Sequence, residues 1–263
     1  MLWDINLKLK IDINCDLGES YGTFKIGNDE KIMPHITSAN IACGFHAGDP
    51  TTIMQTINLA KKHGVAVGAH PGYPDLLGFG RREMRLTLEE IKNYTIYQVS
   101  ALQGFAKIAG LNLQHVKPHG ALYNTAVKDV ETSRGIIDAV KVLDKNLIIF
   151  APPKSILAKT AADAGLRVAY EFFADRAYNA DGSLVSRKQP NSIITKPSRV
   201  LERTLKVIRE GKVLAANGET VTLGKVHTIC VHGDTPTAIK LTDILKKELV
   251  KSGVEVMSVG NFI

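Results

Sequence analysis

Apolar and polar positions along the chain follow two alternating periods. Short runs rich in β-branched residues are separated by longer segments in which apolar residues recur at helical spacing, a pattern that predicts strands and amphipathic helices in turn. The expected strands are 10–16, 37–43, 65–70, 114–119, 146–150, 167–173, 226–232 and 254–258. The expected helices are 51–63, 88–109, 129–143, 155–164, 197–210 and 236–252.

The ends of these helices have their own signals. Asp49-Pro50 precedes the first expected helix as an N-cap and first-turn pair. Glycines stand directly after four of the helices, where a left-handed residue commonly ends a helix: Gly64, Gly110, Gly165 and Gly211.

Strand–helix alternation over the whole length predicts an α/β fold with a mostly parallel sheet. No G-x-G-x-x-G follows the first strand, so a dinucleotide-binding fold lacks its fingerprint. A closed β/α barrel is favoured, because barrel enzymes place their sites where the strands end. Polar, chemically capable residues recur at those positions: Asp16, His70, His119, Glu171 and His232.

We expect one domain over residues 1–263, with two insertions. The segment 174–196 is longer than a minimal connection and is predicted to be a lid over the strand ends. Residues 213–223, with Asn217-Gly218 at their centre, predict a hairpin.

Composition and charge narrow the function classes. The formal net charge is +7, but lysines and arginines are dispersed over helical segments and mixed with acidic residues, so no nucleic-acid partner is expected. A basic balance also suits an enzyme that handles small anions. No apolar run approaches the length of a membrane helix and the three cysteines form no C-x-x-C pair, so we expect a cytoplasmic protein with no membrane partner.

The first strand has three polar residues on one face. Asp12, Asn14 and Asp16 alternate with apolar residues, so their side chains point the same way. Buried carboxylates are costly unless they line a polar cavity or bind a cation. We expect Asp12 to be structural and Asp16 to be functional, with Glu19 joining it at the barrel mouth.

Two Gly-rich turns contain histidines. His46 lies between Gly44 and Gly48, and His70 ends the strand that contains Gly68. Imidazole titrates near neutral pH, so His70 is a candidate metal ligand or general acid–base. The alternative is a core histidine bonded to a backbone carbonyl. Gly68 is expected to leave space near the barrel axis.

His115, Lys117 and His119 share one face of the fourth expected strand. A buried lysine is rare unless it is paired or functional, and Asp12 or Asp16 is the expected partner. Lys117 is a candidate for polarising a carbonyl or holding a carboxylate, with His119 as proton carrier. Structural ion pairing of Lys117 is the alternative. Tyr123 follows in the next turn.

The cluster contains no dominant nucleophile. There is no G-x-S-x-G elbow and no H-E-x-x-H pair, although an aspartate with two histidines is a plausible zinc set. Such a cluster suits hydrolysis of an unreactive amide by an activated water.

Six sequence blocks resemble the signature of the LamB/YcsF family. They are IDINCDLGES, SANIACGFHAGDP, GAHPGYPD, VKPHGALYN, FFADRAY and CVHGDTPTA, and they occur in family order between residues 11 and 238. The resemblance implies a seven-stranded variant of the β/α (TIM-like) barrel, similar to the glycoside hydrolase/deacetylase superfamily. One expected strand, 254–258, then lies outside the barrel.

The resemblance also implies one component of an ATP-dependent 5-oxoprolinase, which cleaves the lactam 5-oxoproline to L-glutamate with partner subunits B and C. ATP enters as a Mg-bound co-substrate, although the chain has no G-x-x-x-x-G-K-[ST] loop. No metal ligand is assigned, and an intrinsic divalent metal stays open. The alternatives are a metal-dependent amidohydrolase or deacetylase without ATP, and a non-catalytic substrate-binding subunit.

The site residues are predicted from these blocks and from the strand-end pattern together. The predicted catalytic residues are Asp16, His70, Lys117, His119 and Glu171. The predicted substrate-binding residues are Asn14, Asn40, His46, Tyr123, Arg176 and His232.

Overall fold

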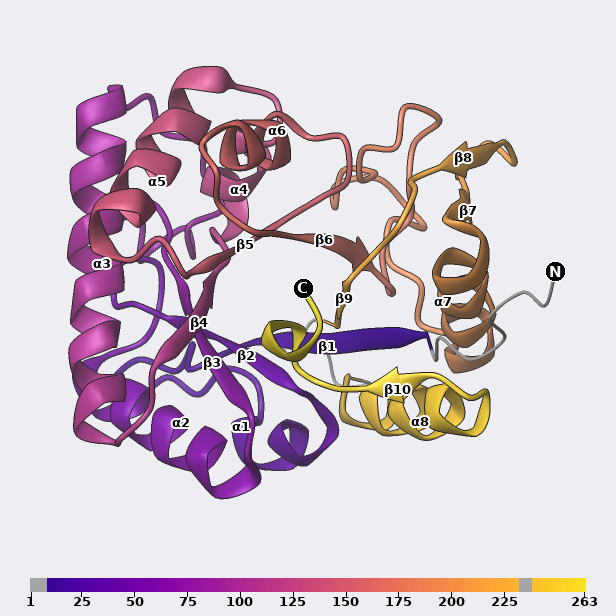
Figure 1. Cartoon of the computed structure of the whole chain (residues 1–263), viewed down its shortest axis with the longest axis horizontal. Coiled ribbons are helices and arrows are strands. Elements are labelled where there is room, and N and C mark those ends of the chain that lie inside the picture. Colours follow the sequence, from indigo (N-terminus) through magenta and orange to yellow (C-terminus); the bar gives the residue numbers. More distant parts are fainter. Residues whose placement is uncertain (1–8, 232–237) are drawn as a thin grey trace, which may run out of the picture.

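Seven parallel strands close into a barrel in the computed structural model, which describes residues 9–231 and 238–263 (Figure 1). Closure is made by β1, which pairs with β2 on one side and β9 on the other. The barrel strands are β1 (Lys10–Leu17), β2 (Ser38–Ala42), β3 (Ala66–His70), β4 (Leu113–Val116), β5 (Ile148–Ala151), β6 (Val168–Phe173) and β9 (Thr228–Cys230). The predicted seven-stranded variant of the β/α barrel is confirmed.

Helices surround the barrel (Figure 1). They are α1 (Asp29–Ile32), α2 (Pro50–His63), α3 (Leu88–Ile108), α4 (Gly120–Ala126), α5 (Val130–Leu143), α6 (Ile156–Asp163), α7 (Pro197–Glu210) and α8 (Ala238–Lys251), with 3-10 turns η1 (Met33–His35) and η2 (Val259–Asn261). Asp49 caps α2 by accepting from the Thr52 amide, as predicted. Gly64 and Gly211 end α2 and α7 at φ 66° and 65°, the left-handed region in which glycine avoids a Cβ clash.

The structure departs from the prediction at the fourth strand and at two short helices. The fourth strand was expected over 114–119, but β4 ends at Val116, so Lys117 and His119 belong to the connection that leads into α4. The missed helices α1 and α4 have only 4 and 7 residues, too few for a helical period to show in the sequence. The last predicted barrel strand and helix extend into residues 232–237, which are outside the described part of the chain.

The two predicted insertions lie at the carboxyl end of the barrel. β7 (Lys212–Leu214) and β8 (Thr220–Thr222) form the predicted antiparallel hairpin. The segment 174–196 has no named helix or strand, only the isolated bridges Arg176–Ile193 and Tyr178–Leu184. At the other end, η2 packs Val259 against Ile148 and Phe150 and covers the barrel, as Figure 1 shows.

β10 (Glu255–Val256) pairs with β1 outside the ring, so the expectation for 254–258 is confirmed. One large cluster of buried apolar side chains extends from Ile11 to Val254 and joins the strands to the helices. We therefore keep the proposal of a single domain. None of the described helices is long and apolar enough to cross a membrane.

The strand register brings polar side chains into one row inside the barrel. Asp16 is paired with Asn40, Asn40 with Gly68, and Gly68 with His115. Gly68 was expected to leave space near the axis, but the His115 ring fills it, because a Cβ on Gly68 would lie 2.2 Å from His115 Nε2. The barrel interior is thus packed, and open space begins above this row.

Candidate active site

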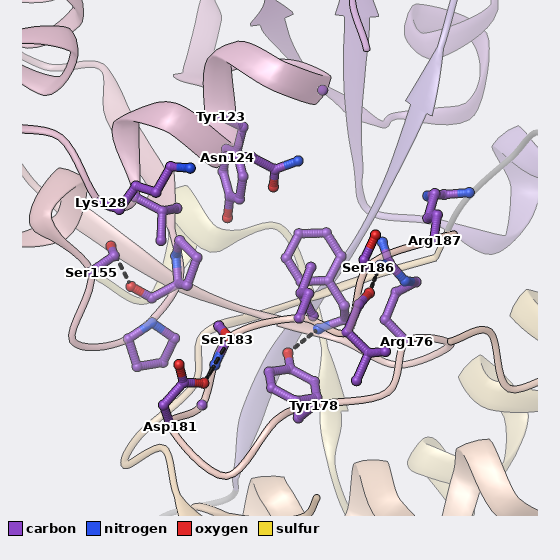
Figure 2. Close-up of a pocket in the computed structure, with 18 of the residues that line it drawn as sticks. Tyr123, Asn124, Lys128, Ser155, Arg176, Tyr178, Asp181, Ser183, Ser186 and Arg187 are labelled. Atoms are coloured by element: carbon purple, nitrogen blue, oxygen red, sulfur yellow. Dashed lines mark hydrogen bonds between the residues drawn. The ribbon is translucent and has the colours of Figure 1, made fainter. Parts of the chain in front are cut away.

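A cavity of about 1180 Å³ opens at the carboxyl end of the barrel. Its floor includes Asp16, Lys117 and His119, and its walls come from α4, the segment 180–188 and the hairpin strand β8. Figure 2 shows Tyr123 and Asn124 of α4 opposite Asp181 and Ser183 of that segment. The insertion predicted to be a lid therefore forms part of the cavity wall. The volume exceeds that of ordinary small-molecule pockets, so the cavity has room for more than one small reactant.

Asp12 lies below the cavity in a layer of hydroxyl groups. Its Oδ1 accepts from Thr37 Oγ1 at 2.6 Å and Ser38 Oγ at 2.7 Å, and Thr228 Oγ1 donates to Oδ2. Burial raises the pKa of Asp12 to about 6, although these hydrogen bonds lower it. The structural role expected for Asp12 agrees with these contacts.

The raised pKa of Asp12 predicts an unusual pH dependence of stability. The folded chain binds this proton more tightly than the unfolded chain, so the stabilisation is complete below about pH 4 and is lost as pH rises through about 6. As the pH rises from 4 to 7, we expect the ionisation of Asp12 to lower the free energy of unfolding by about 2 kcal/mol. Asp12→Asn, which cannot ionise, is expected to lack this contribution.

Denaturant unfolding of the chain and of Asp12→Asn at both pH values measures this difference. The variant is expected to gain about 2 kcal/mol on the parent between pH 4 and pH 7. An equal pH dependence in the two proteins would contradict the raised pKa.

Above Asp12, two asparagines connect the strands. Asn40 Nδ2 donates to Asn14 Oδ1 and to Asp16 Oδ1, both at 2.7 Å. His115 Nε2 lies 2.7 Å from Asn40 Oδ1, which fixes the Asn40 amide in this orientation. Asn14 and Asn40 were predicted to bind substrate; in the structure both are buried and their amides are engaged with these neighbours.

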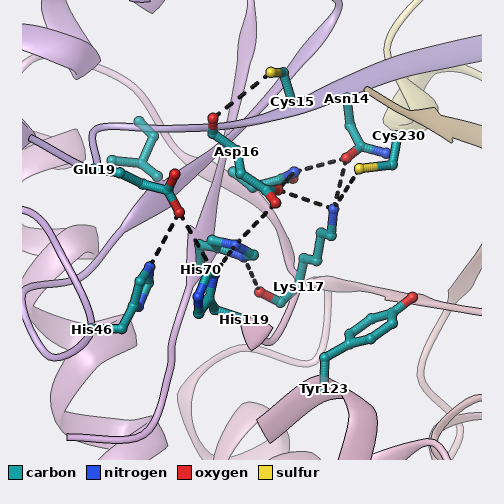
Figure 3. Close-up of polar contacts among 12 residues, drawn as sticks. Asn14, Cys15, Asp16, Glu19, His46, His70, Lys117, His119, Tyr123 and Cys230 are labelled. Carbon is teal, nitrogen blue, oxygen red and sulfur yellow. Dashed lines mark hydrogen bonds and ion pairs between the residues drawn. The ribbon is translucent and has the colours of Figure 1, made fainter. Parts of the chain in front are cut away.

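Lys117 lies at the centre of a buried charge cluster (Figure 3). Its Nζ is 3.0 Å from Asp16 Oδ1 and 2.9 Å from Glu171 Oε1. Asn14 Oδ1 and Cys230 Sγ are both 3.1 Å away. Burial by itself lowers the pKa of Lys117, but attraction to these groups, Asp16 first, outweighs it and raises the pKa well above its usual range.

Glu171 joins the charge cluster to Tyr123. Its Oε1 accepts from Asn14 Nδ2 at 3.0 Å and its Oε2 accepts from the Tyr123 hydroxyl at 2.6 Å. Burial and then the Glu171 carboxylate raise the pKa of Tyr123 well above its usual range. Glu171 is fully buried, whereas Asp16 keeps 14% of its side chain exposed toward the cavity. Asp16 is therefore the carboxylate of this cluster that a ligand can reach.

Three histidines and a glutamate converge beside Asp16 (Figure 3). Glu19, His46, His70 and His119 are all buried, and one ligand atom from each lies within 4.8 Å of the others. His46 and His119 stack with ring centroids 3.7 Å apart, and His70 Nε2 is 3.5 Å from Asp16 Oδ2. Burial lowers the pKa of His119 to about 3 and that of His46 well below its usual range. These side chains offer donor atoms of the kind that bind a transition metal.

The remaining predicted site residues occupy different positions. Arg176 lines the cavity, and its guanidinium donates to the carbonyls of Val185 and Ser192, so it holds the insertion together. His232 lies outside the described residues. His46 is fully buried and does not line the cavity. The catalytic and substrate-binding roles assigned to these residues stay predictions.

Two contributors were missed by the sequence interpretation. Cys230 contacts Lys117, and its inward direction follows from strand alternation with Thr228, a signal that was available. Arg81 lines the cavity from the connection between β3 and α3, where no periodic pattern predicted a position.

The cavity lining is predominantly cationic. Among the described residues, seven cationic side chains and three carboxylates line it. The cations are Arg81, Lys117, Lys128, Lys154, Arg176, Arg187 and Lys188, and the carboxylates are Asp16, Glu19 and Asp181. A concave surface with this charge attracts small anions.

The chain is similar to proteins of known families over nearly its whole length. The family model described as LamB/YcsF family matches residues 11–263. A protein from Pyrococcus abyssi (strain GE5 / Orsay), named as the A subunit of 5-oxoprolinase, is 52% identical over 255 residues, which cover 97% of this chain and 100% of the relative. A protein of the same name from Syntrophobacter fumaroxidans (strain DSM 10017 / MPOB) is 52% identical over 252 residues, covering 96% and 99%.

A solved structure agrees with these relatives. The crystal structure of a lactam utilization protein from Thermus thermophilus matches with a TM-score of 0.89 and 48% identity, covering 94% of this chain and 99% of that one. With the family model matched from the first barrel strand to the last residue, the chain belongs to the LamB/YcsF family.

Proposed function

We propose that this chain is the A subunit of an ATP-dependent 5-oxoprolinase, which cleaves 5-oxoproline to L-glutamate in the cytoplasm together with subunits B and C. The names of relatives that are 52% identical over nearly the full chain support the 5-oxoprolinase assignment. The observation that connects it to chemistry is the ion pair of buried Lys117 with partly exposed Asp16 at the floor of a cationic cavity.

The reactants are anions, which suits the cavity lining. 5-Oxoproline has one carboxylate and ATP has several phosphate charges. Exposed cations on the wall, among them Lys128 and Lys188, are proposed to bind these groups. ATP is expected to lie along this wall as its Mg complex.

Lys117 and Asp16 are proposed to act on the lactam itself. The Lys117 ammonium is held in place by two carboxylates, so it stabilises negative charge on the lactam oxygen without reorganising. Asp16, which faces the cavity, accepts a proton from the attacking water. Glu171 and Tyr123 position Lys117 from below.

Coupling to ATP follows from the stability of the lactam amide. Transfer of the γ-phosphoryl group to the lactam oxygen releases ADP and makes the ring carbon electrophilic. Water then adds to that carbon, the C–N bond breaks with its electron pair going to nitrogen, and a second water displaces phosphate from the resulting acyl phosphate. The products balance as L-glutamate, ADP and phosphate.

The test is a reconstitution of the complex. The purified chain is mixed with its B and C partners, ATP, Mg²⁺ and 5-oxoproline, and glutamate and ADP are measured together, with each component omitted in turn. We expect glutamate and ADP in equal amounts only when all components are present.

Ring opening or deacetylation by the chain alone, without ATP, would instead indicate a metal-dependent amidohydrolase. The cluster of three histidines and a glutamate makes this the second candidate function. Full activity of the complex without this chain's site residues would indicate a non-catalytic role.

A further inference from the structure

Four ligand atoms from Glu19, His46, His70 and His119 lie within 4.8 Å of one another, and three of the six distances among them are close to those of a tetrahedral metal site. Glu19 Oε1 is 3.5 Å from His46 Nε2 and 3.6 Å from His119 Nδ1, and His119 Nδ1 is 3.0 Å from His70 Nε2. Four ligands that each bind zinc at about 2.0–2.1 Å are separated by about 3.3–3.4 Å. The three distances given above, 3.0, 3.5 and 3.6 Å, lie on either side of that value.

Hydrogen bonds fix which nitrogens of His70 and His119 carry a hydrogen. His70 Nδ1 lies 2.7 Å from the Lys117 carbonyl, and His119 Nε2 lies 2.8 Å from the Phe79 carbonyl. A carbonyl only accepts, so each of these nitrogens is the N–H of a neutral ring. The two other nitrogens, His70 Nε2 and His119 Nδ1, then face each other at 3.0 Å with lone pairs.

Two facing lone pairs with carboxylates close by repel one another unless a positive species lies between them. Asp16 Oδ2 is 3.5 Å from His70 Nε2 and adds a further oxygen to the same region. A shared proton would bridge only His70 Nε2 and His119 Nδ1. A metal ion uses all the lone pairs at once.

His46 gives an independent indication. Among the described residues, neither of its ring nitrogens has a hydrogen-bond partner, although the side chain is fully buried. Buried polar atoms in native proteins are nearly always hydrogen-bonded, so an imidazole without a hydrogen bond, whose Nε2 lies 3.5 Å from Glu19 Oε1, is suited to bind an ion at this point.

The surrounding backbone is shaped to hold these rings. A Cβ on Gly72 would lie 2.7 Å from His46 Nδ1, and one on Gly80 would lie 2.7 Å from His46 Cβ and 2.8 Å from His119 Cδ2. Phe79, which presents its carbonyl to His119, has φ 54°, a left-handed conformation that non-glycine residues seldom adopt. Strained backbone of this kind is retained where the surrounding structure positions a functional group.

We propose that Glu19, His46, His70 and His119 form a closed, four-ligand site for a divalent transition-metal ion of the Zn²⁺ type. The carbonyls of Lys117 and Phe79 orient two of the ligands, as outer-shell groups do in metal sites. In this arrangement His70 and His119 keep their hydrogens on the nitrogens that face the carbonyls and bind the ion through the other nitrogens, rather than transferring protons. The site braces the wall of the cavity next to Asp16, and it does not depend on the identity of the substrate.

The test measures metal binding by the full-length chain. The purified chain is stripped with a chelator and titrated with Co²⁺, whose visible absorption reports tetrahedral coordination, and its zinc content is measured after Zn²⁺ is added back. We expect one equivalent per chain, a higher melting temperature with the ion, and no competition from Mg²⁺, which prefers oxygen ligands. His46→Ala and Glu19→Gln are each expected to weaken binding by at least about 100-fold.

His227→Ala is the matched control, because His227 is a buried histidine that stacks on Tyr170 outside the cluster. It is expected to bind the ion like the parent. Absence of the Co²⁺ spectrum and of retained zinc in the parent chain would overturn the proposal, as would unchanged affinity in both ligand variants. Since the readout is metal content, metal binding without glutamate formation would contradict only the proposed reaction.

Discussion

Lys117→Met is expected to abolish glutamate formation by the reconstituted complex and to destabilise the chain by about 3–5 kcal/mol. The ammonium of Lys117 is the group between the Asp16 and Glu171 carboxylates, 3.0 and 2.9 Å away, and its side chain is 3% exposed. Removing it leaves two carboxylates buried without their cation, which costs far more than an exposed ion pair contributes. Glutamate release and denaturant unfolding measure the two effects.

Two further variants make this result specific to the charge cluster. Lys107→Met changes an exposed lysine of α3 and is expected to stay within about 0.5 kcal/mol of the parent with full activity. Adding Glu171→Gln to Lys117→Met removes one of the orphaned charges, so stability is expected to recover in part while activity does not. Retained glutamate formation in Lys117→Met would exclude the lysine from the proposed reaction.

His119→Ala is expected to lower glutamate formation by at least about 100-fold. The ring stacks on His46, faces His70 at 3.0 Å and lines the cavity floor, so its loss is expected to disturb the floor beside Asp16. The same preparation is analysed for Zn²⁺, because the two roles considered for His119 differ there. Loss of activity together with the metal indicates a ligand, whereas loss of activity with the metal retained indicates proton transfer.

His227→Ala is the control for removing a buried, stacked imidazole. His227 accepts from the Tyr170 amide at 3.1 Å, and its side chain is not among those lining the cavity. We expect it to retain glutamate formation while losing some stability. If His119→Ala behaved like this control, His119 would have no part in either the reaction or the metal site.

Much of the fold could be predicted from the sequence because the information is local. Period-two and helical patterns located the seven barrel strands and six of the helices, and glycines and Asp49-Pro50 marked where helices end. The 7-residue helix α4 was not predicted, because it is too short to show a helical period. Lys117 was predicted to lie in the fourth strand, but that strand ends at Val116. In this stretch, backbone hydrogen bonds from Lys117 to Ala69 and from His119 to Pro71 continue past the strand, a contact that no local pattern shows.

The candidate site was predicted as a set of residues, but not as an arrangement. The strand-end pattern and the family resemblance together selected Asp16, His70, Lys117, His119 and Glu171, and all five meet at one end of the barrel. The pattern left Asp12 and Asp16 open as partners of Lys117. The structure decides for Asp16, because the strand register connects His115 near the end of β4 to Asp16 through Gly68 and Asn40. Asp12 lies further down β1 and bonds to Thr37, Ser38 and Thr228 instead.

By itself, then, the sequence determined the barrel, the end of it that holds the candidate site and most of the side chains there, since alternation and chain order are properties of neighbouring residues. Only the tertiary structure decided that Glu19 and His46, which come from two different loops, meet His70 and His119 with their lone pairs converging. The tautomer of His70 depends on the Lys117 carbonyl, and that of His119 depends on the Phe79 carbonyl. Closure of the barrel and folding of a loop bring these carbonyls to the two rings. Such contacts between distant segments arise from packing, which no periodicity in the chain encodes.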